Sequence, residues 1–269
     1  MNKTISTYWL YVKQDIKSQL KYPLDFSIQL IIWTIYTIIP YLGLNILFYR
    51  FGQIGEWSLY HVGILYSIIG LSYDFSRMIG RAYDDFHKLM RRGDLDIFLS
   101  RPQSLTIQIM GSQFFLRRLA GIINYIVIFY ISLRRIDFIN IQNPMILICC
   151  YIVIILATIF IFLGLLIIYA ATCIFTIKKN SFSDIFIDTI AQISYLPNEY
   201  MNSVMKYLLL SIVPLSITTY YPVKSLFFGT NISQVYLQVF FALIVGIMFF
   251  LLSQIIFRFA LRYYKSCGN

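Results

Sequence analysis

Long apolar runs separated by short polar segments dominate the sequence. The runs at 24–49, 57–75, 145–177 and 232–257 approach or exceed the ~20 residues with which a helix crosses a hydrocarbon core of ~30 Å. A membrane β-barrel would instead show alternating segments of ~10 residues. The pattern therefore predicts an all-α integral membrane protein with a single transmembrane domain over residues 1–269.

A further span must end near Leu133, but the clean apolar run before it is too short to cross alone. The span is therefore expected over 109–133. This range puts Arg117 and Arg118 at the cytoplasmic edge, where long basic side chains reach the lipid headgroups. A position along a substrate path is the alternative for these two arginines.

The region 182–222 contains two weaker candidates. The segment 182–197 carries Asp184 and Asp188, and the more apolar segment 204–222 contains Pro214. If both crossed, the chain would have seven spans and its termini would lie on opposite sides. We expect that one of them spans and that the other is a short interfacial or re-entrant helix, which gives six spans.

The basic residues favour six spans with both termini in the cytoplasm, because cytoplasmic loops carry an excess of Lys and Arg. On the inside this topology puts Lys3, Lys13, Lys17, Lys21, Arg77, Arg81, Lys88, Arg91, Arg92, Arg101, Arg117, Arg118, Lys178, Lys179, Arg258, Arg262 and Lys265. On the outside it puts only Arg50, Arg134, Arg135 and Lys224, with Lys206 undecided.

Residues 1–23 are expected to form a helix that lies in the cytoplasmic interface. The lysines spread through this segment exclude the uninterrupted apolar core of a cleavable signal peptide. An apolar stripe and a basic stripe run along the same helical wheel. They comprise Trp9, Val12, Ile16 and Leu20, and Lys13, Lys17 and Lys21, respectively.

Composition supports the membrane class. The chain is 59% hydrophobic and 13% charged, against about 25% charged residues in soluble domains. The net charge of +10 sits at the ends of apolar runs, a distribution that matches anionic headgroups rather than nucleic acid. The cysteines lack metal-site or CxxC spacing and are expected as small buried apolar residues. They are Cys149, Cys150, Cys173 and Cys267.

The polar stretch 76–104 predicts a helix, a stop and a second short helix. Met78, Ala82, Phe86 and Leu89 lie along one apolar face of the first helix. Its end is marked by Arg91 and Arg92, which complement the helix dipole, and by Gly93, which suits a left-handed cap. Asp94 is positioned to cap the second helix and Pro102 to stop it. The prediction is a rigid elbow beneath the membrane.

Two segments resemble a known family. The sequence GDLDIFLSRPQS at 93–104 resembles the G-x-L-D-x-x-L-x-R-P-x-S signature of the membrane subunits of ABC-2 type ABC transporters, in the branch related to viologen exporters. The segment 193–229 is similar to that branch's pattern of a proline, a tyrosine-containing turn, a basic-apolar helix and further prolines. Ser100 and Gln103 depart from the residues usual at their positions.

The resemblance implies a six-transmembrane-helix ABC-2 bundle of the type V exporter kind, in which 76–104 is the coupling region between the second and third spans. We expect it to dock on a separate ATPase, with two apolar anchors and a polar rim. The contacting residues are Asp84, Asp85, Phe86, His87, Leu89, Arg91 and Arg92, with Phe86 and Leu89 as the anchors. The elbow-shaping residues are Gly93, Asp94, Asp96 and Pro102.

The implied assembly is an exporter in the cell membrane with two ATPase subunits and a second permease, identical or homologous. One copy supplies only six spans, so a translocation path would form at a subunit interface. The aromatic and methionine-rich apolar faces suit an amphiphilic or lipophilic cargo.

The sequence contains no G-x-x-x-x-G-K-[ST] phosphate loop, so ATP and magnesium are expected on the partner and no cofactor on this chain. His61 and His87 are far apart, and no catalytic arrangement of residues stands out. Two other functions remain open: an ATP-independent channel or carrier, and a membrane-embedded transferase. Transport driven by an ion gradient without nucleotide would distinguish the first, and turnover by the chain alone the second.

Overall fold

The computed structural model describes residues 3–136, 144–176, 181–229 and 231–264. Over these residues the chain is almost entirely helical. The helices are α1 (Lys3–Leu20), α2 (Pro23–Phe51), α3 (Leu59–Ile79), α4 (Arg81–Asp84), α5 (Phe86–Arg91), α6 (Asp94–Ser100), α7 (Leu105–Ser112), α8 (Leu119–Arg134), α9 (Pro144–Thr176), α10 (Ser181–Ile193), α11 (Ser203–Tyr207), α12 (Leu215–Thr218), α13 (Tyr220–Phe228) and α14 (Ile232–Leu261).

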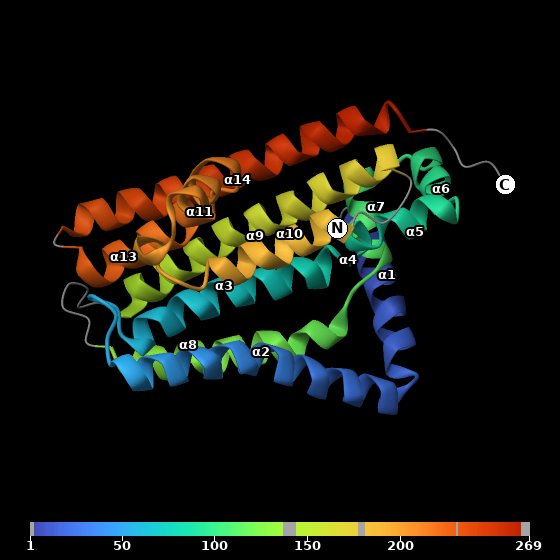
Figure 1. The fold of residues 1–269 in the computed structure, drawn as a ribbon. Coiled ribbons are helices and arrows are strands. Elements are labelled where there is room, and N and C mark those ends of the chain that lie inside the picture. Colours follow the sequence, from blue (N-terminus) through green and yellow to red (C-terminus); the bar gives the residue numbers. More distant parts are fainter. Residues whose placement is uncertain (1–2, 137–143, 177–180, 230, 265–269) are drawn as a thin grey trace.

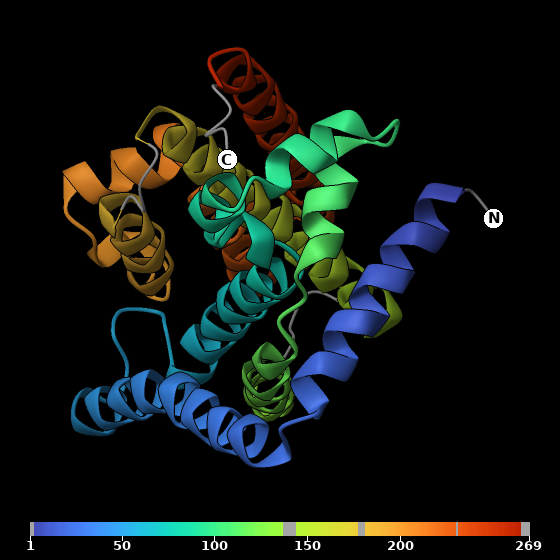
Figure 2. The same cartoon turned by 90° about the vertical axis from the view of Figure 1, so that its right-hand side faces the viewer.

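The long helices form one bundle. Helices α2, α3, α8, α9 and α14 run along its length, and the short helices α4 to α7 gather at one end (Figure 1). Both ends of the described chain lie at this end as well (Figure 2). The bundle therefore has a large end built from short helices, and an opposite end where the chain turns between long ones.

Helix α1 lies across the large end of the bundle, roughly perpendicular to α2 (Figure 1). Val12, on the predicted apolar stripe, is buried, whereas Trp9 and Leu20 on the same stripe are exposed. This arrangement is the one expected for an amphipathic helix that lies on a membrane surface and offers part of its apolar face to lipid.

Helices α9 and α14 pack closely against each other. A Cβ atom added at Gly246 in α14 would lie 2.5 Å from the carbonyl oxygen of Ala157, and one added at Gly164 in α9 would lie 2.7 Å from Cδ1 of Phe249. Small residues at such positions let two backbones approach within membranes, where dispersion replaces the hydrophobic effect as the force between helices. The glycines therefore set the distance between these two helices.

Helix α3 is the centre of the bundle. Most of its residues are buried, among them Ile64, Tyr66 and Ile68. The Ser72 and Ser76 hydroxyls each donate to a backbone oxygen of α3. They also contact backbone oxygens of α9: Ser72 lies 3.3 Å from the Ile155 oxygen, and Ser76 lies 3.2 Å from the Ile159 oxygen. Neighbouring helices rather than lipid cover α3, so it tolerates polar residues that a lipid-facing span would not.

Four helices in the described part of the chain are long and apolar enough to cross a membrane. They are Pro23–Phe51, Leu116–Arg134, Met145–Thr176 and Ile232–Leu261. A bent pair, Ser203–Ile212 and Leu215–Phe228, passes the same test together, so the number is five if this pair is one span. Helix α3 is not among them because of its polar residues.

The segment expected as one continuous span at 109–133 is broken. Helix α7 ends at Ser112, residues 113–115 are extended, and the chain becomes helical again in the turn Leu116–Arg118 before α8. Asp15 and Gln19 of α1 bind the backbone of this break, since the Asp15 carboxylate accepts the Phe114 N–H at 2.8 Å and Gln19 Oε1 accepts the Leu116 N–H at 3.1 Å. These side chains satisfy backbone groups that a continuous helix would have satisfied itself.

The region 194–228 folds as a hairpin that enters the bundle and returns. Its two helical arms, Ser203–Ile212 and Leu215–Phe228, are bent by 75° with respect to each other around Pro214. The tip of the hairpin, represented by Leu209, Val213 and Leu215, is buried in the hydrophobic core.

Both ends of this hairpin lie beside the loop that joins α2 to α3. The Tyr200 hydroxyl donates to the Ile54 carbonyl at 2.7 Å, and the Tyr220 ring stacks on Trp57 with centroids 5.8 Å apart. Glu199 accepts hydrogen bonds from Tyr220, at 2.8 Å, and from Lys224. The bond from Lys224 is the main reason that the pKa of Glu199 lies below its usual value, so this link is lost as the pH falls through that lowered pKa.

Candidate functional site

The short helices α4 to α6 pack their apolar faces against the bundle. The Phe86 ring meets Phe257 of α14 edge to face at 5.5 Å between centroids, and Tyr83 meets the same ring at 5.9 Å. Met90 and Leu95 are also buried in this core. The predicted elbow is therefore attached to α14 through aromatic contacts.

The stop between α5 and α6 has the predicted geometry at Gly93. Its φ is +73°, in the left-handed region, and its N–H donates to the Met90 carbonyl at 3.1 Å. Asp94 differs from the prediction: it is the first residue of α6, and no side chain caps that helix. Asp94 and Asp96 instead lie in the first turn, where negative charge complements the helix dipole. Pro102 follows the end of α6 and is exposed.

The predicted ATPase-contacting residues divide into two groups. Asp84, Phe86, His87 and Leu89 are buried within the chain itself, with exposed fractions of 7%, 0%, 7% and 4%. Arg91 and Arg92 are exposed, and the Asp85 side chain is 14% exposed. The burial of Phe86 and Leu89 does not favour their prediction as anchors for a partner, since the apolar face that carries them is covered by α9 and α14.

The acidic residues of the elbow bind cations of the same chain. Asp85 pairs with Arg81 at 2.7 Å and with Lys88 at 2.9 Å. Asp84 lies 3.8 Å from Arg77, which also pairs with Asp188 of α10 at 2.8 Å. Asp84, which sequence reasoning placed on a polar rim, thus links the elbow through Arg77 to α3 and α10, whereas the pairs of Asp85 lie within the elbow.

A second ion pair lies deeper in the bundle. Arg118 pairs with Asp74 of α3 at 2.5 Å, with side-chain exposed fractions of 4% and 2%, and its guanidinium lies 4.0 Å above the Trp33 ring. Gly121 leaves room for the carboxylate, because a Cβ there would overlap Asp74. The expectation that Arg118 reaches the headgroups is wrong, since a buried carboxylate holds it inside.

The exposed surface of α6 is the part of this end that sequence reasoning missed. Leu95 and Phe98 face the core, whereas Ile97 and Leu99 are 50% and 49% exposed. Arg91 and Arg92 at the end of α5 and Arg101 directly after α6 are exposed too. We call Ile97 and Leu99, with these three arginines, the α6 tip. The signal was the presence of apolar residues on both faces of DLDIFLS, which is too short to need two apolar faces for its own packing.

Other chemistry is not evident at this site. Among the described residues, no group of three or more His, Cys, Asp or Glu could hold a metal ion. Cys150 and Cys173 are buried, Cys149 is exposed, and Cys267 lies outside the described residues.

The long apolar helices define a multi-pass membrane protein. The sequence model of the family described as "ABC-2 family transporter protein" matches residues 34–268, so the chain belongs to that family. The family comprises membrane transport components that associate with an ABC ATPase subunit, and the chain is thus a permease component rather than the ATPase. Comparison with curated proteins and with solved structures found no match.

Proposed function

We propose that this chain is the permease subunit of an ATP-driven exporter, related to the viologen exporter branch, that works with two ATPase subunits and a second permease copy or paralogue. The observation that carries the proposal is the α6 tip, which exposes two apolar side chains on different sides of α6, together with three exposed arginines next to it in sequence, at the end where the short helices gather. Apolar anchors within a charged rim are the usual composition of a protein interface.

The α6 tip replaces Phe86 and Leu89 as the proposed apolar contact. Ile97 and Leu99 anchor in the ATPase, and Arg91, Arg92 and Arg101 fix its register. Phe86 has a transmitting role, because it joins the elbow to Phe257 of α14. A displacement of α6 by the ATPase is thus passed through packed aromatic rings to a long helix, as a rigid-body movement of a two-state bundle.

The proposed topology has six spans, namely α2, α3, α8, α9, α10 and α14, with the large end of the bundle in the cytoplasm. The fifth crossing is the stretch 181–197, in which α10 supplies 13 helical residues, about 20 Å, and the residues after it complete the crossing. The contacts of Tyr200 and Tyr220 with the loop between α2 and α3 support a re-entrant hairpin at 203–228 that opens to the outside. The hairpin is buried in protein at its tip, as non-helical backbone at membrane depth must be.

Cysteine labelling tests this topology. In a background without the native cysteines, a membrane-impermeant thiol reagent added outside should label Glu199→Cys and Lys224→Cys, because both side chains lie at the outer mouth of the hairpin. Arg92→Cys at the α6 tip is the matched control and should react with the reagent only after the membrane is permeabilised. Labelling of Glu199→Cys and Lys224→Cys from opposite sides would show that the bent pair crosses the membrane.

Purification from native membranes tests the function. The tagged chain should co-purify with a P-loop ATPase, with about one ATPase per tagged chain. ATP should stimulate transport by this complex. Recovery of the chain without any ATPase, together with transport driven by an ion gradient alone, would contradict the proposal.

A further inference from the structure

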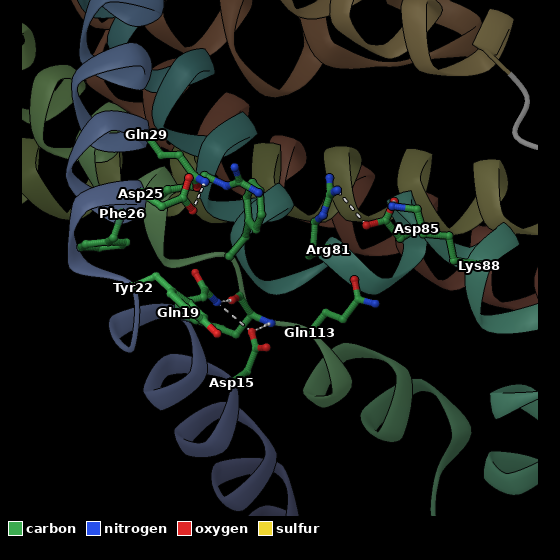
Figure 3. A pocket seen from close by; sticks show the side chains of 13 residues that line it. Asp15, Gln19, Tyr22, Asp25, Phe26, Gln29, Arg81, Asp85, Lys88 and Gln113 are labelled. Carbon is green, nitrogen blue, oxygen red and sulfur yellow. Dashed lines mark hydrogen bonds and ion pairs between the residues drawn. The ribbon is translucent and has the colours of Figure 1, made fainter. Parts of the chain in front are cut away.

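Two cavities share a wall at the large end of the bundle, between α1, the start of α2, α4, α5 and the break before α8. The wider cavity has a volume of about 440 Å³, and its polar lining comprises Asp15, Gln19, Asp25, Gln29, Arg81, Asp85, Lys88, Gln113 and Arg117 (Figure 3). The second cavity has a volume of about 340 Å³, and its lining includes Gln29, Phe115 and Arg118. Gln29, Arg81, Phe115 and Arg117 line both cavities.

The carboxylates of the wider cavity already have partners. Asp25 accepts a hydrogen bond from Gln29 at 2.6 Å, and Asp85 pairs with Arg81 and Lys88. Asp15 accepts bonds from Gln19 and from the Phe114 N–H, both at 2.8 Å (Figure 3). These bonds fix α1 against the backbone that carries Arg117, so the cavity is formed before any ligand enters it.

The second cavity contains an excess of positive charge. It is lined by Arg81, Arg117 and Arg118 and by no carboxylate. Arg81 and Arg118 have carboxylate partners outside this cavity, whereas Arg117 makes no ion pair with any of the described residues. The guanidinium carbons of Arg117 and Arg81 lie 3.5 Å and 4.5 Å from the centroid of the same Phe115 ring. Both cations line this cavity, and an anion bound in it would reduce their mutual repulsion.

One side of this cavity is apolar and opens toward the surface of α2. Ile32 and Trp33 line it, and Ile28, Ile31 and Ile35 continue the exposed apolar surface of the same helix with exposed fractions of 54%, 59% and 51%. A bound molecule that follows both surfaces must have an anionic group at one end and a hydrocarbon chain at the other.

We propose that the two cavities form a binding site for an anionic membrane phospholipid. Its phosphate is held by Arg117 with support from Arg81, since the planar guanidinium binds two phosphate oxygens at once. Its acyl chain lies along α2, next to Ile32. The proposal rests on the proposed topology only in that this end of the bundle meets the inner membrane surface. It adds a lipid contact that joins α1, the elbow and the start of α8.

Binding of short-chain lipids to the purified full-length chain in detergent tests this site. Dioctanoyl phosphatidylglycerol should bind and raise the melting temperature, and Arg117→Ala should weaken its binding by about tenfold or more, the effect of losing a hydrogen-bonded charge. Arg117→Lys keeps the positive charge but loses the paired N–H donors of the guanidinium, so this variant should bind the lipid with intermediate affinity. Arg135→Ala, which removes an exposed arginine at the opposite end, is the matched control and should bind as the wild type does.

Inorganic phosphate and zwitterionic phosphatidylcholine test whether the site binds an anionic lipid rather than free phosphate or any phospholipid. Inorganic phosphate alone should bind far more weakly than the lipid, and Ile32→Asp should weaken lipid binding without affecting the weak binding of phosphate. Equal binding of phosphatidylglycerol to the wild type and to both Arg117 variants would overturn the proposal. Full stabilisation by inorganic phosphate, or equal binding of zwitterionic phosphatidylcholine, would overturn it as well. No ATPase takes part in these measurements, so their outcome is independent of the proposed function.

Discussion

Replacing Asp74 by alanine is expected to lower the free energy of unfolding by about 3–5 kcal/mol, because it leaves the Arg118 guanidinium buried without its carboxylate. The same loss is expected for Arg118→Ala, which leaves the carboxylate unpaired. Combining the two substitutions should cost less than the sum of the single effects, since the double variant contains neither buried charge. Denaturant unfolding in detergent micelles measures all three values.

The neighbouring arginine provides the matched control. Arg117 is adjacent in sequence but only partly buried, and it makes no ion pair with the described residues. Its replacement by alanine should therefore cost less than about 1 kcal/mol, as for an exposed side chain. Equal and small effects of Asp74→Ala and Arg117→Ala would show that the ion pair with Arg118 does not hold α3 and α8 together.

Replacing Ile97 and Leu99 together by aspartate is expected to reduce co-purification of the ATPase by more than about tenfold. Two apolar anchors at the centre of an interface contribute about 1–2 kcal/mol each, and the loss of both exceeds one factor of ten in affinity. The substitutions should leave the fold intact, because both side chains are half exposed. The amount of ATPase recovered per tagged chain is the measurement.

Phe51→Asp is the control for this experiment. Phe51 is 66% exposed and ends α2 at the opposite end of the bundle, so its replacement should not change the recovery of the ATPase. If the α6 variant retains the ATPase while its melting temperature equals that of the wild type, then the α6 tip is not the docking surface.

The long, strongly apolar helices could be predicted closely from the sequence. The runs 24–49, 145–177 and 232–257 correspond to α2, α9 and α14, at Pro23–Phe51, Pro144–Thr176 and Ile232–Leu261. Sequence suffices here because each run is longer than the ~20 apolar residues that a helix needs to cross the hydrocarbon core, whatever its neighbours are. The family was also accessible, because GDLDIFLSRPQS carries its signature within a few residues.

Which other segments of the chain pack against each helix could not be predicted from the sequence. Periodicity showed that Phe86 and Leu89 share an apolar face, but it could not show that α14 of the same chain covers that face. The pairing of Asp74 with Arg118 joins residues of two helices, and no local pattern in either helix marks it. The contacts of Asp15 and Gln19 with the break before α8 are likewise formed between distant segments, so a span was expected over 109–133 without a break.

Site-specific photo-crosslinking in native membranes tests the central claim most directly. A photoreactive residue in place of Leu99 should form an adduct with the P-loop ATPase, and one in place of Phe51 should not. Adducts from position 99 that contain the ATPase would support an ATP-driven permease coupled through α6. Their absence, with ATPase adducts formed from another surface of the chain or from none, would contradict it.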